Sequence, residues 1–110
     1  MHKFCDFYKK IYFTSFRILK KDRFGIFMKI ENTCLDIIEI LTEARFENKT
    51  YKLKPLKSAH IKVETLKLLI RISWELQIIG DKKYIELENY LVEISKDINN
   101  WINSLTQKEF

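Results

Sequence analysis

Residues 82–105 read KKYIELENYLVEISKDINNWINSL, and the spacing of the apolar side chains in this stretch decides the fold. Two interleaved series recur every seven positions, namely Tyr84, Leu91, Ile98 and Leu105, and Leu87, Ile94 and Trp101. A helix with this repeat presents one narrow apolar seam to its neighbours, as helices in coiled coils and four-helix bundles do. The stretch therefore predicts a long helix that packs against other helices.

Apolar residues at helical spacing predict three further helices, over about residues 3–19, 22–47 and 55–79. Short connections make neighbouring helices antiparallel. With the last helix at about 82–105, the sequence predicts an all-α protein, an up-down-up-down antiparallel four-helix bundle. A chain of 110 residues has room for one core, so we expect a single domain over residues 1–110.

The expected helix boundaries rest on four residues that start or stop helices. Asp22 and Asp81 are expected as N-caps, because a carboxylate accepts hydrogen bonds from unpaired amides at a helix start. Pro55 suits the first turn of the third helix. Gly80 is expected to end that helix in the left-handed conformation.

Composition agrees with long helices and indicates where the protein resides. The chain has only two glycines and one proline, too few for a many-turned β fold. Cys5 and Cys34 lie on different predicted helices, and we expect both to be reduced core thiols of a cytoplasmic protein. The N-terminus MHKFCDFYKK is too charged for a signal peptide, and no apolar run approaches the ~20 residues that span a membrane. The sequon at residues 48–50 is then a chance match.

Basic residues are segregated along the chain, whose formal net charge is +5. Residues 1–30 carry eight Lys or Arg against two acids, and residues 49–62 carry five lysines and no acid. Flexible cations of this kind suit sequence-independent contact with the phosphates of RNA or single-stranded DNA. The alternative is an ordinary solvated surface. The candidate nucleic-acid-binding residues are Lys3, Lys10, Arg17, Lys20, Lys21, Arg23, Lys49, Lys52, Lys54 and Lys57.

Four aromatic residues are further candidates for contact with nucleic acid, namely Tyr12, Phe13, Tyr51 and Trp101. Such rings stack on unpaired bases in proteins that bind single strands. Aromatic residues at helical spacing are more often part of a core, however. We therefore assign these four to the core and leave them out of the site.

The helices predicted over 22–47 and 55–79 carry more apolar residues than a solitary bundle covers. Burying a leftover aliphatic stripe gains about 25 cal/mol per Å². We therefore expect a homo-oligomer, the alternative being a monomer with scattered surface aliphatics. The candidate interface residues are Phe24, Met28, Leu35, Ile61, Leu68, Ile72, Leu76 and Ile79.

Glu31 and Asn32 interrupt the most apolar helix. Glu31 is expected to be a partly buried carboxylate paired with Arg45 or Arg71, and Asn32 to cap or bridge to a neighbouring helix. A di-metal bundle needs Glu-x-x-His on two helices, a motif that does not occur in the sequence.

Other chemical signatures are also weak. His60 with Glu64 is at most a surface metal pair, and no local Ser/His or Cys/His signature indicates a nucleophile. Two separate glycines cannot form a phosphate-cradling loop. We therefore expect neither an enzyme nor a resident metal or cofactor.

Three segments carry a resemblance to a known family. These are RFG-x4-IENT-x2-DI-x-E-x3-EA-R over residues 23–45, LKLLIRISWEL-x-IIG over 66–80, and KKY-x6-L-x-EI with the NNW at 99–101. Together they resemble the four-helix-bundle proteins related to Avd, the accessory variability determinant of diversity-generating retroelements. A broader neighbour is the bundle family encoded in ribosomal-RNA intervening sequences, which shares the fold and length.

The resemblance implies a homopentameric assembly whose basic surface binds RNA or single-stranded DNA and the retroelement's reverse transcriptase. Such an accessory protein supports mutagenic cDNA synthesis while catalysis belongs to the polymerase. Two alternatives stay open: a protein of the intervening-sequence type, and a protein-only oligomeric scaffold. The latter would bind a protein partner through an acidic strip formed by Asp36, Glu39 and Glu43.

Overall fold

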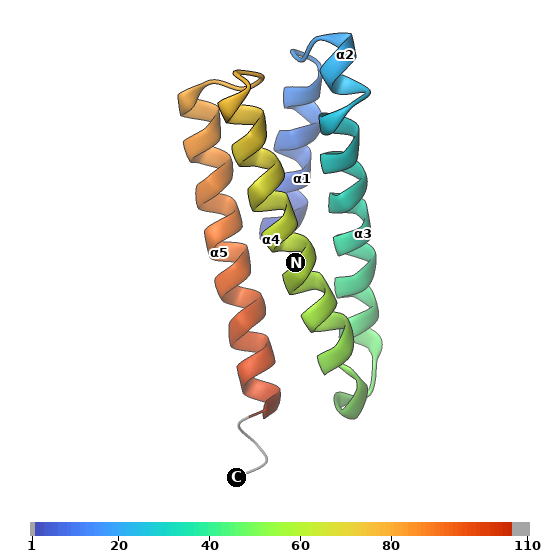
Figure 1. The fold of residues 1–110 in the computed structure, drawn as a ribbon. Helices are drawn as coiled ribbons and strands as arrows, with labels where there is room; N and C mark the ends of the chain where they lie inside the picture. Colours follow the sequence, from blue (N-terminus) through green and yellow to red (C-terminus); the bar gives the residue numbers. More distant parts are fainter. Residues whose placement is uncertain (1, 107–110) are drawn as a thin grey trace.

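The computed structural model describes residues 2–106, which form an antiparallel bundle of four long helices (Figure 1). The long helices are α1 (His2–Ser15), α3 (Ile26–Phe46), α4 (Leu53–Glu75) and α5 (Asp81–Thr106). The short helix α2 (Lys20–Arg23) joins α1 to α3, and the 3-10 turn η1 (Lys49–Tyr51) joins α3 to α4. The predicted all-α, up-down-up-down architecture is confirmed. Met1 and residues 107–110 of the predicted single domain lie outside the described residues.

The core runs along the axis of the bundle, where each long helix contributes side chains at steps of three and four. α1 packs mainly against α3 and α5, and α4 packs against the same two helices. The seam predicted for α5 is confirmed: Leu87, Leu91, Ile94 and Ile98 are buried, while Tyr84, Trp101 and Leu105 pack against the core from its edge. Cys34 is buried as expected, whereas Cys5 is only half-buried.

The first helical connection differs from its prediction. α1 ends at Ser15 instead of residue 19, and the helix expected from residue 22 is split into α2 and α3. The hydroxyls of Thr14 and Ser15 donate to the carbonyl oxygens of Lys10 and Tyr12 at 2.7 and 2.6 Å, the local bonding with which such residues compete with a continuing helix. Asp22 lies inside α2, so its predicted N-cap role is wrong.

Gly25 occupies the N-cap position of α3, without a side-chain cap. A Cβ at this position would lie 3.1 Å from the carbonyl oxygen of Lys21. The close approach of the chain to α2 therefore favours glycine here. The sequence pattern alone could not show this requirement for glycine, because the apolar spacing continues across the interruption between α2 and α3.

The turn between α4 and α5 corrects two further predictions. No described glycine has a positive φ; Gln77, with φ of 61°, takes the left-handed conformation expected of Gly80. Asp81 is the first residue of α5 instead of its N-cap, and its carboxylate accepts a hydrogen bond of 2.7 Å from the indole Nε1 of Trp74. The Trp74 ring stacks on Tyr84 with centroids 4.6 Å apart. These contacts fix the turn through side chains.

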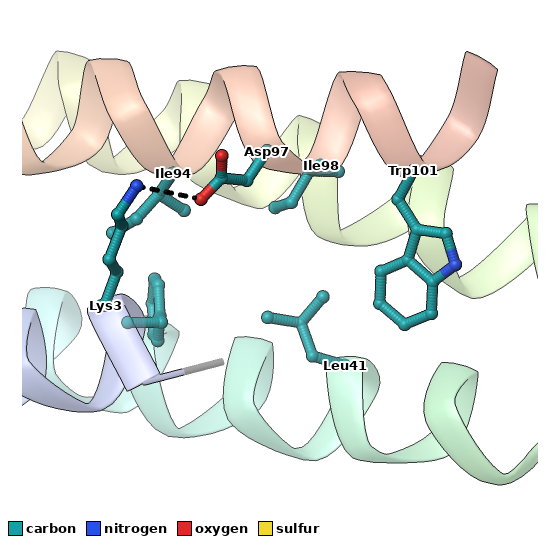
Figure 2. Close-up of a pocket in the computed structure, with 7 residues that line it drawn as sticks. Lys3, Leu41, Ile94, Asp97, Ile98 and Trp101 are labelled. Atoms are coloured by element: carbon teal, nitrogen blue, oxygen red, sulfur yellow. Dashed lines mark hydrogen bonds and ion pairs between the residues drawn. The ribbon is translucent and has the colours of Figure 1, made fainter. Parts of the chain in front are cut away.

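Helix lengths are unequal, and the bundle is correspondingly open at one end. α1 has 14 residues and α5 has 26, and α1 begins near mid-height of the bundle in Figure 1. A cavity of about 70 Å³ opens below α1 between Leu41 of α3 and Ile94, Ile98 and Trp101 of α5 (Figure 2). This cavity is much smaller than the ~300 Å³ at which small-molecule sites begin.

None of the helices within residues 2–106 combines the length and apolar character required to cross a membrane.

The left-handed residue of the α4–α5 turn gives a stability prediction. We expect Gln77→Gly to stabilise the fold by about 0.5–1 kcal/mol, because a side chain in the left-handed region costs roughly 1–2 kcal/mol and part of this is offset by the entropy of glycine in the unfolded chain. Urea unfolding followed by circular dichroism measures the change.

Gly80→Ala is the matched control. A Cβ at Gly80 meets nothing within 4 Å, so this variant should be neutral or slightly more stable. A loss of 1 kcal/mol or more in Gly80→Ala, together with no gain in Gln77→Gly, would contradict the assignment.

Candidate nucleic-acid and subunit interfaces

Most of the predicted basic residues lie in two groups at opposite ends of the molecule. Arg17, Lys20, Lys21 and Arg23 lie where α1 ends and α2 begins, whereas residues 49–57 lie at the α3–α4 connection. Figure 1 shows these two connections at opposite ends of a bundle whose longest dimension is 50 Å. A single short strand of nucleic acid would therefore meet only one of the two groups.

Lys3 and Lys10 are held by acids of α5. The Lys3 Nζ lies 3.2 Å from Asp97 and 3.4 Å from Glu93, and the hydrogen bond to Asp97 raises the pKa of this ammonium (Figure 2). The Lys10 Nζ lies 3.3 Å from Glu86 and 5.7 Å from the ring centre of Tyr90. Both lysines thus dock α1 on α5, and their charge is partly neutralised within the chain.

Glu86 is shared between two cations. Its carboxylate lies 3.3 Å from both Lys10 and Lys83. Burial opposes ionisation of this carboxyl, but hydrogen bonds from Lys83 and Lys10 prevail and lower its pKa. It therefore stays ionised at neutral pH and links α1 to the first turns of α5.

Lys52 has a structural role that the sequence did not reveal. Its Nζ donates to the carbonyl oxygens of Ala44 and Arg45 at 2.8 and 3.1 Å, and lies 5.8 Å from the ring centre of Trp101. A cation at the last carbonyls of a helix satisfies acceptors that lack helical partners and favours the helix dipole. Lys52 therefore caps α3 and is a poor candidate for phosphate binding.

The remaining candidates at the α3–α4 connection differ among themselves. Lys54 and Lys57 are exposed and, within residues 2–106, take part in no ion pair. Lys49 is exposed but has an interaction within the chain.

The α1–α2 end presents uncompensated positive charge. Arg17, Lys20 and Lys21 are exposed and have no ion-pair partner among the described residues. Arg23 is half-buried and lies 5.4 Å from the ring centre of Phe24. This end is the strongest candidate for contact with a polyanion.

The assignment of nearby aromatic residues to the core is wrong for three of the four. Tyr12 and Phe13 on α1 and Tyr51 in η1 are exposed, whereas Trp101 is half-buried against the core. The signal was available in the sequence: Tyr12 and Phe13 fall outside the helical arc of Phe4, Phe7 and Ile11 that is buried. Phe16, which was not singled out, is also exposed.

Most of the apolar side chains predicted to lie outside the core of the bundle on the α3 and α4 sides are exposed to solvent. Phe24, Met28 and Leu35 are exposed, as are Ile61, Leu68 and Leu76 of the α4 side. Two candidates differ: Ile72 is half-buried, and Ile79 is 5% exposed and belongs to the chain's own core, so it is removed from the candidate interface. Because α4 ends at Glu75, Ile79 lies in the α4–α5 turn, where the helical spacing of α4 no longer sets the direction of its side chain.

The two apolar stripes lie on different sides of the molecule. Asp36 of α3 approaches Lys62 of α4 at 4.0 Å, so the acidic strip Asp36, Glu39 and Glu43 borders α4. At 100° per residue, Leu35 and Met28 project from the flank of α3 beyond that strip, toward α1. The exposed stripe of α4 therefore does not merge with that of α3.

Glu31 and Asn32 do not make the predicted contacts. Glu31 is half-buried, but among the described residues it has no ion pair with Arg45, Arg71 or any other cation. Arg45 lies 14 positions along the same helix, and Arg71 faces Glu75 at 4.0 Å. Glu31 instead borders Tyr8 and Cys34; burial first and the charge of Glu31 second raise the pKa of that thiol. Asn32 is exposed, with no side-chain hydrogen bond inside residues 2–106.

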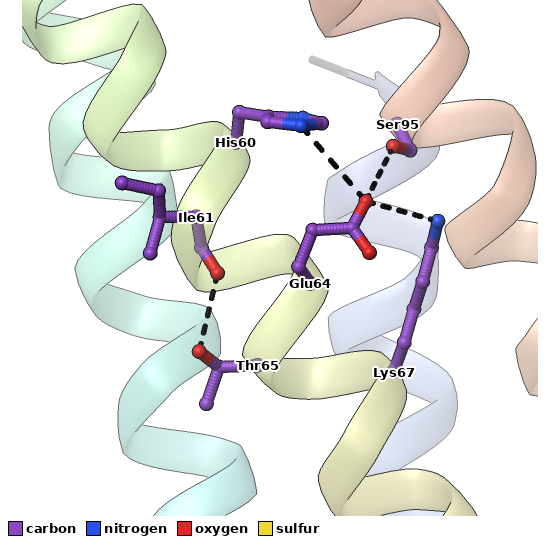
Figure 3. A network of polar contacts seen from close by, with 6 residues as sticks. All are labelled: His60, Ile61, Glu64, Thr65, Lys67 and Ser95. Carbon is purple, nitrogen blue, oxygen red and sulfur yellow. Dashed lines mark hydrogen bonds and ion pairs between the residues drawn. The ribbon is translucent and has the colours of Figure 1, made fainter.

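The His60–Glu64 pair is part of a polar network between α4 and α5 (Figure 3). The Glu64 carboxylate lies 3.2 Å from both the Lys67 Nζ and the Ser95 hydroxyl, and 4.0 Å from the His60 Nε2. Burial opposes ionisation of Glu64, but the bond from Lys67 prevails and lowers its pKa. Residues 2–106 contain no group of three or more potential metal ligands. The hydrogen bond that Ser95 donates to Glu64 ties α5 to α4.

Taken together, the structure is a four-helix bundle with exposed apolar side chains on α3 and α4 and a basic, aromatic end. A family model described as bAvd-like matches residues 1–105. The chain belongs to this family, and the resemblance of its three segments is confirmed. Comparison with curated proteins and with solved structures finds no match.

The contrast between two lysines gives a prediction for the α3–α4 connection. We expect Lys52→Ala to destabilise the fold by about 1–2 kcal/mol, because two carbonyl groups lose a charged donor. Lys54→Ala should change the stability by less than about 0.5 kcal/mol, as surface substitutions usually do. Thermal unfolding of both variants measures the difference, and equal melting temperatures would refute the capping role.

Proposed function

We propose that this chain is a non-catalytic accessory protein of a diversity-generating retroelement. In this role it is a homo-oligomeric basic scaffold that binds the reverse transcriptase and RNA or single-stranded DNA, and it supports mutagenic cDNA synthesis in the cytoplasm. Membership of the bAvd-like family over residues 1–105 is the observation that carries the proposal.

Homo-oligomerisation is supported by the two separate apolar stripes. An interface between identical faces needs one self-complementary patch, whereas two different patches suit head-to-tail association, which closes into a ring when the rotation between subunits allows it. The stripe Phe24, Met28 and Leu35 and the stripe Ile61, Leu68 and Leu76 are such a pair. A pentamer is the ring size that the family resemblance favours.

Nucleic-acid binding is supported by the unpaired cations at the α1–α2 end. In a ring, each subunit would contribute Arg17, Lys20 and Lys21, and several weak phosphate contacts would act together on one strand. The exposed acidic strip Asp36, Glu39 and Glu43 lies elsewhere on α3 and is a separate surface for a protein partner. The scaffold would thus hold nucleic acid and polymerase on different surfaces.

Assembly is tested by introducing charge into the α4 stripe. The unmodified protein should form an oligomer at micromolar concentration, and Ile61→Asp with Leu68→Asp should reduce it to single chains of 13.4 kDa, because carboxylates cannot be buried in an apolar contact without large cost. Size-exclusion chromatography with light scattering measures the mass.

The control is Ile85→Asp with Val92→Asp on α5, two exposed aliphatics with the same seven-residue spacing outside the proposed interface. This variant should remain oligomeric. A stable single chain in the unmodified protein, or equal dissociation of both variants, would contradict the proposed assembly.

Polyanion binding is tested by charge reversal at each end. Affinity for a single-stranded 20-mer should fall steeply with salt. Lys20→Glu with Lys21→Glu should weaken binding roughly tenfold or more at low salt, and Lys54→Glu with Lys57→Glu, which changes the net charge equally, should weaken it much less. Fluorescence anisotropy measures both, and an equal loss in the two variants would show that the α1–α2 end is not the site.

A further inference from the structure

An exposed cluster of three aromatic rings stands at the C-terminal end of α1. The ring centroids of Tyr12 and Phe13 are 5.5 Å apart, those of Tyr12 and Phe16 are 5.0 Å apart, and those of Phe13 and Phe16 are 6.4 Å apart. Phe13 is 65% exposed, and both of its neighbours are exposed as well. The mutual contacts restrict the ring of Phe13 while leaving most of its surface in water.

Phe13 also forms part of a cationic surface pocket. The pocket has a volume of about 230 Å³ and lies between α1 and the start of α5, where it is lined by Lys10, Phe13, Thr14, Arg17 and Lys83. Three cations face one acid there, since Glu86 bridges Lys10 and Lys83 at 3.3 Å from each. Arg17 lies in the turn that follows α1 and lines the same pocket as Phe13.

We propose that Phe13 stacks on an unpaired base of a single-stranded nucleic acid, while Arg17, which has no ion-pair partner among residues 2–106, contacts the adjoining phosphate. The inference rests on the proposed nucleic-acid binding and specifies the form of nucleic acid that the site accepts. Proteins that bind single strands combine a basic groove with aromatic platforms, and each stacked base contributes substantially to affinity. A paired duplex buries the faces of its bases and would meet only the cations.

The charge around the rings selects this occupant over an apolar peptide. Residues 9–23 hold six Lys or Arg and a single acid, Asp22. An apolar partner would cover the rings but would leave this charge uncompensated or desolvated. An unpaired strand satisfies both features, because its bases are flat and apolar on their faces and its backbone is anionic.

The test compares two labelled strands with the same backbone charge. One is a single-stranded 20-mer of deoxythymidines, and the other is an abasic strand of equal length. Anisotropy titrations at low salt should show that the full chain binds the base-bearing strand roughly tenfold more tightly than the abasic strand, as expected for stacking of at least one base.

Three variants assign that preference to the ring. Phe13→Leu keeps the apolar character and charge, and should lower affinity for the base-bearing strand to that for the abasic strand. Phe13→Trp should restore the preference. Phe46→Leu makes the same substitution at an exposed ring on the last residue of α3, at the opposite end of the bundle from Phe13 (Figure 1), and should leave both affinities unchanged.

Each contrary result has a distinct meaning. No binding of either strand would overturn the proposed nucleic-acid function together with this inference. Equal binding of the two strands, or an unchanged preference in Phe13→Leu, would overturn the stacking role and leave the electrostatic binding intact. Dissociation of the oligomer by Phe13→Leu would instead assign the rings to a subunit contact and overturn the inference.

Discussion

Burial of one apolar seam per helix is the constraint on which the rest of this structure depends. The chain has few turn residues, and within residues 2–106 the helical backbone satisfies its own hydrogen bonds. The packing of one helix on another is therefore determined by the shape and apolar area of their inner faces. Leu66 and Ile70 of α4 and Leu87 and Leu91 of α5 are completely buried in this way. Because the four apolar seams pack against each other, the remaining side chains lie on the surface of a rigid bundle.

The side-chain contacts between helices then determine which charges remain available. α1 is docked on α5 by ion pairs of Lys3 and Lys10, and the α3 end is capped by Lys52. These lysines resemble Lys20 and Lys21 in the sequence, but their role is structural. The cations at the α1–α2 connection lie beside exposed aromatic rings and have no ion-pair partner within residues 2–106. In this they differ from the lysines that hold the helices together. Family membership and this asymmetry lead to the same proposed role.

Much of the fold and part of the site were predictable from particular residues. The seven-residue repeat of Leu87 and Ile94 predicted the inner face of α5, and Met28 and Leu68 were correctly placed outside the core. The errors in the helix boundaries and in the turns fall where the chain changes direction. Gln77 took the conformation expected of Gly80, and Gly25 separated two helices that apolar spacing had joined, because both depend on how the connected helices pack.

The sequence by itself determined the helices, their inner faces and the excess of apolar surface on α3 and α4, since helical period fixes the angular position of every side chain. Only the tertiary structure decided that Lys3 meets Asp97, that Glu31 lies beside Tyr8, and that Phe13 shares a pocket with Lys83. The angular position gives the direction of a side chain from its helix axis. The residue that this side chain contacts depends on how far the neighbouring helix is shifted along the axis and where that helix ends. Those are set by packing of the whole bundle, which no local pattern records.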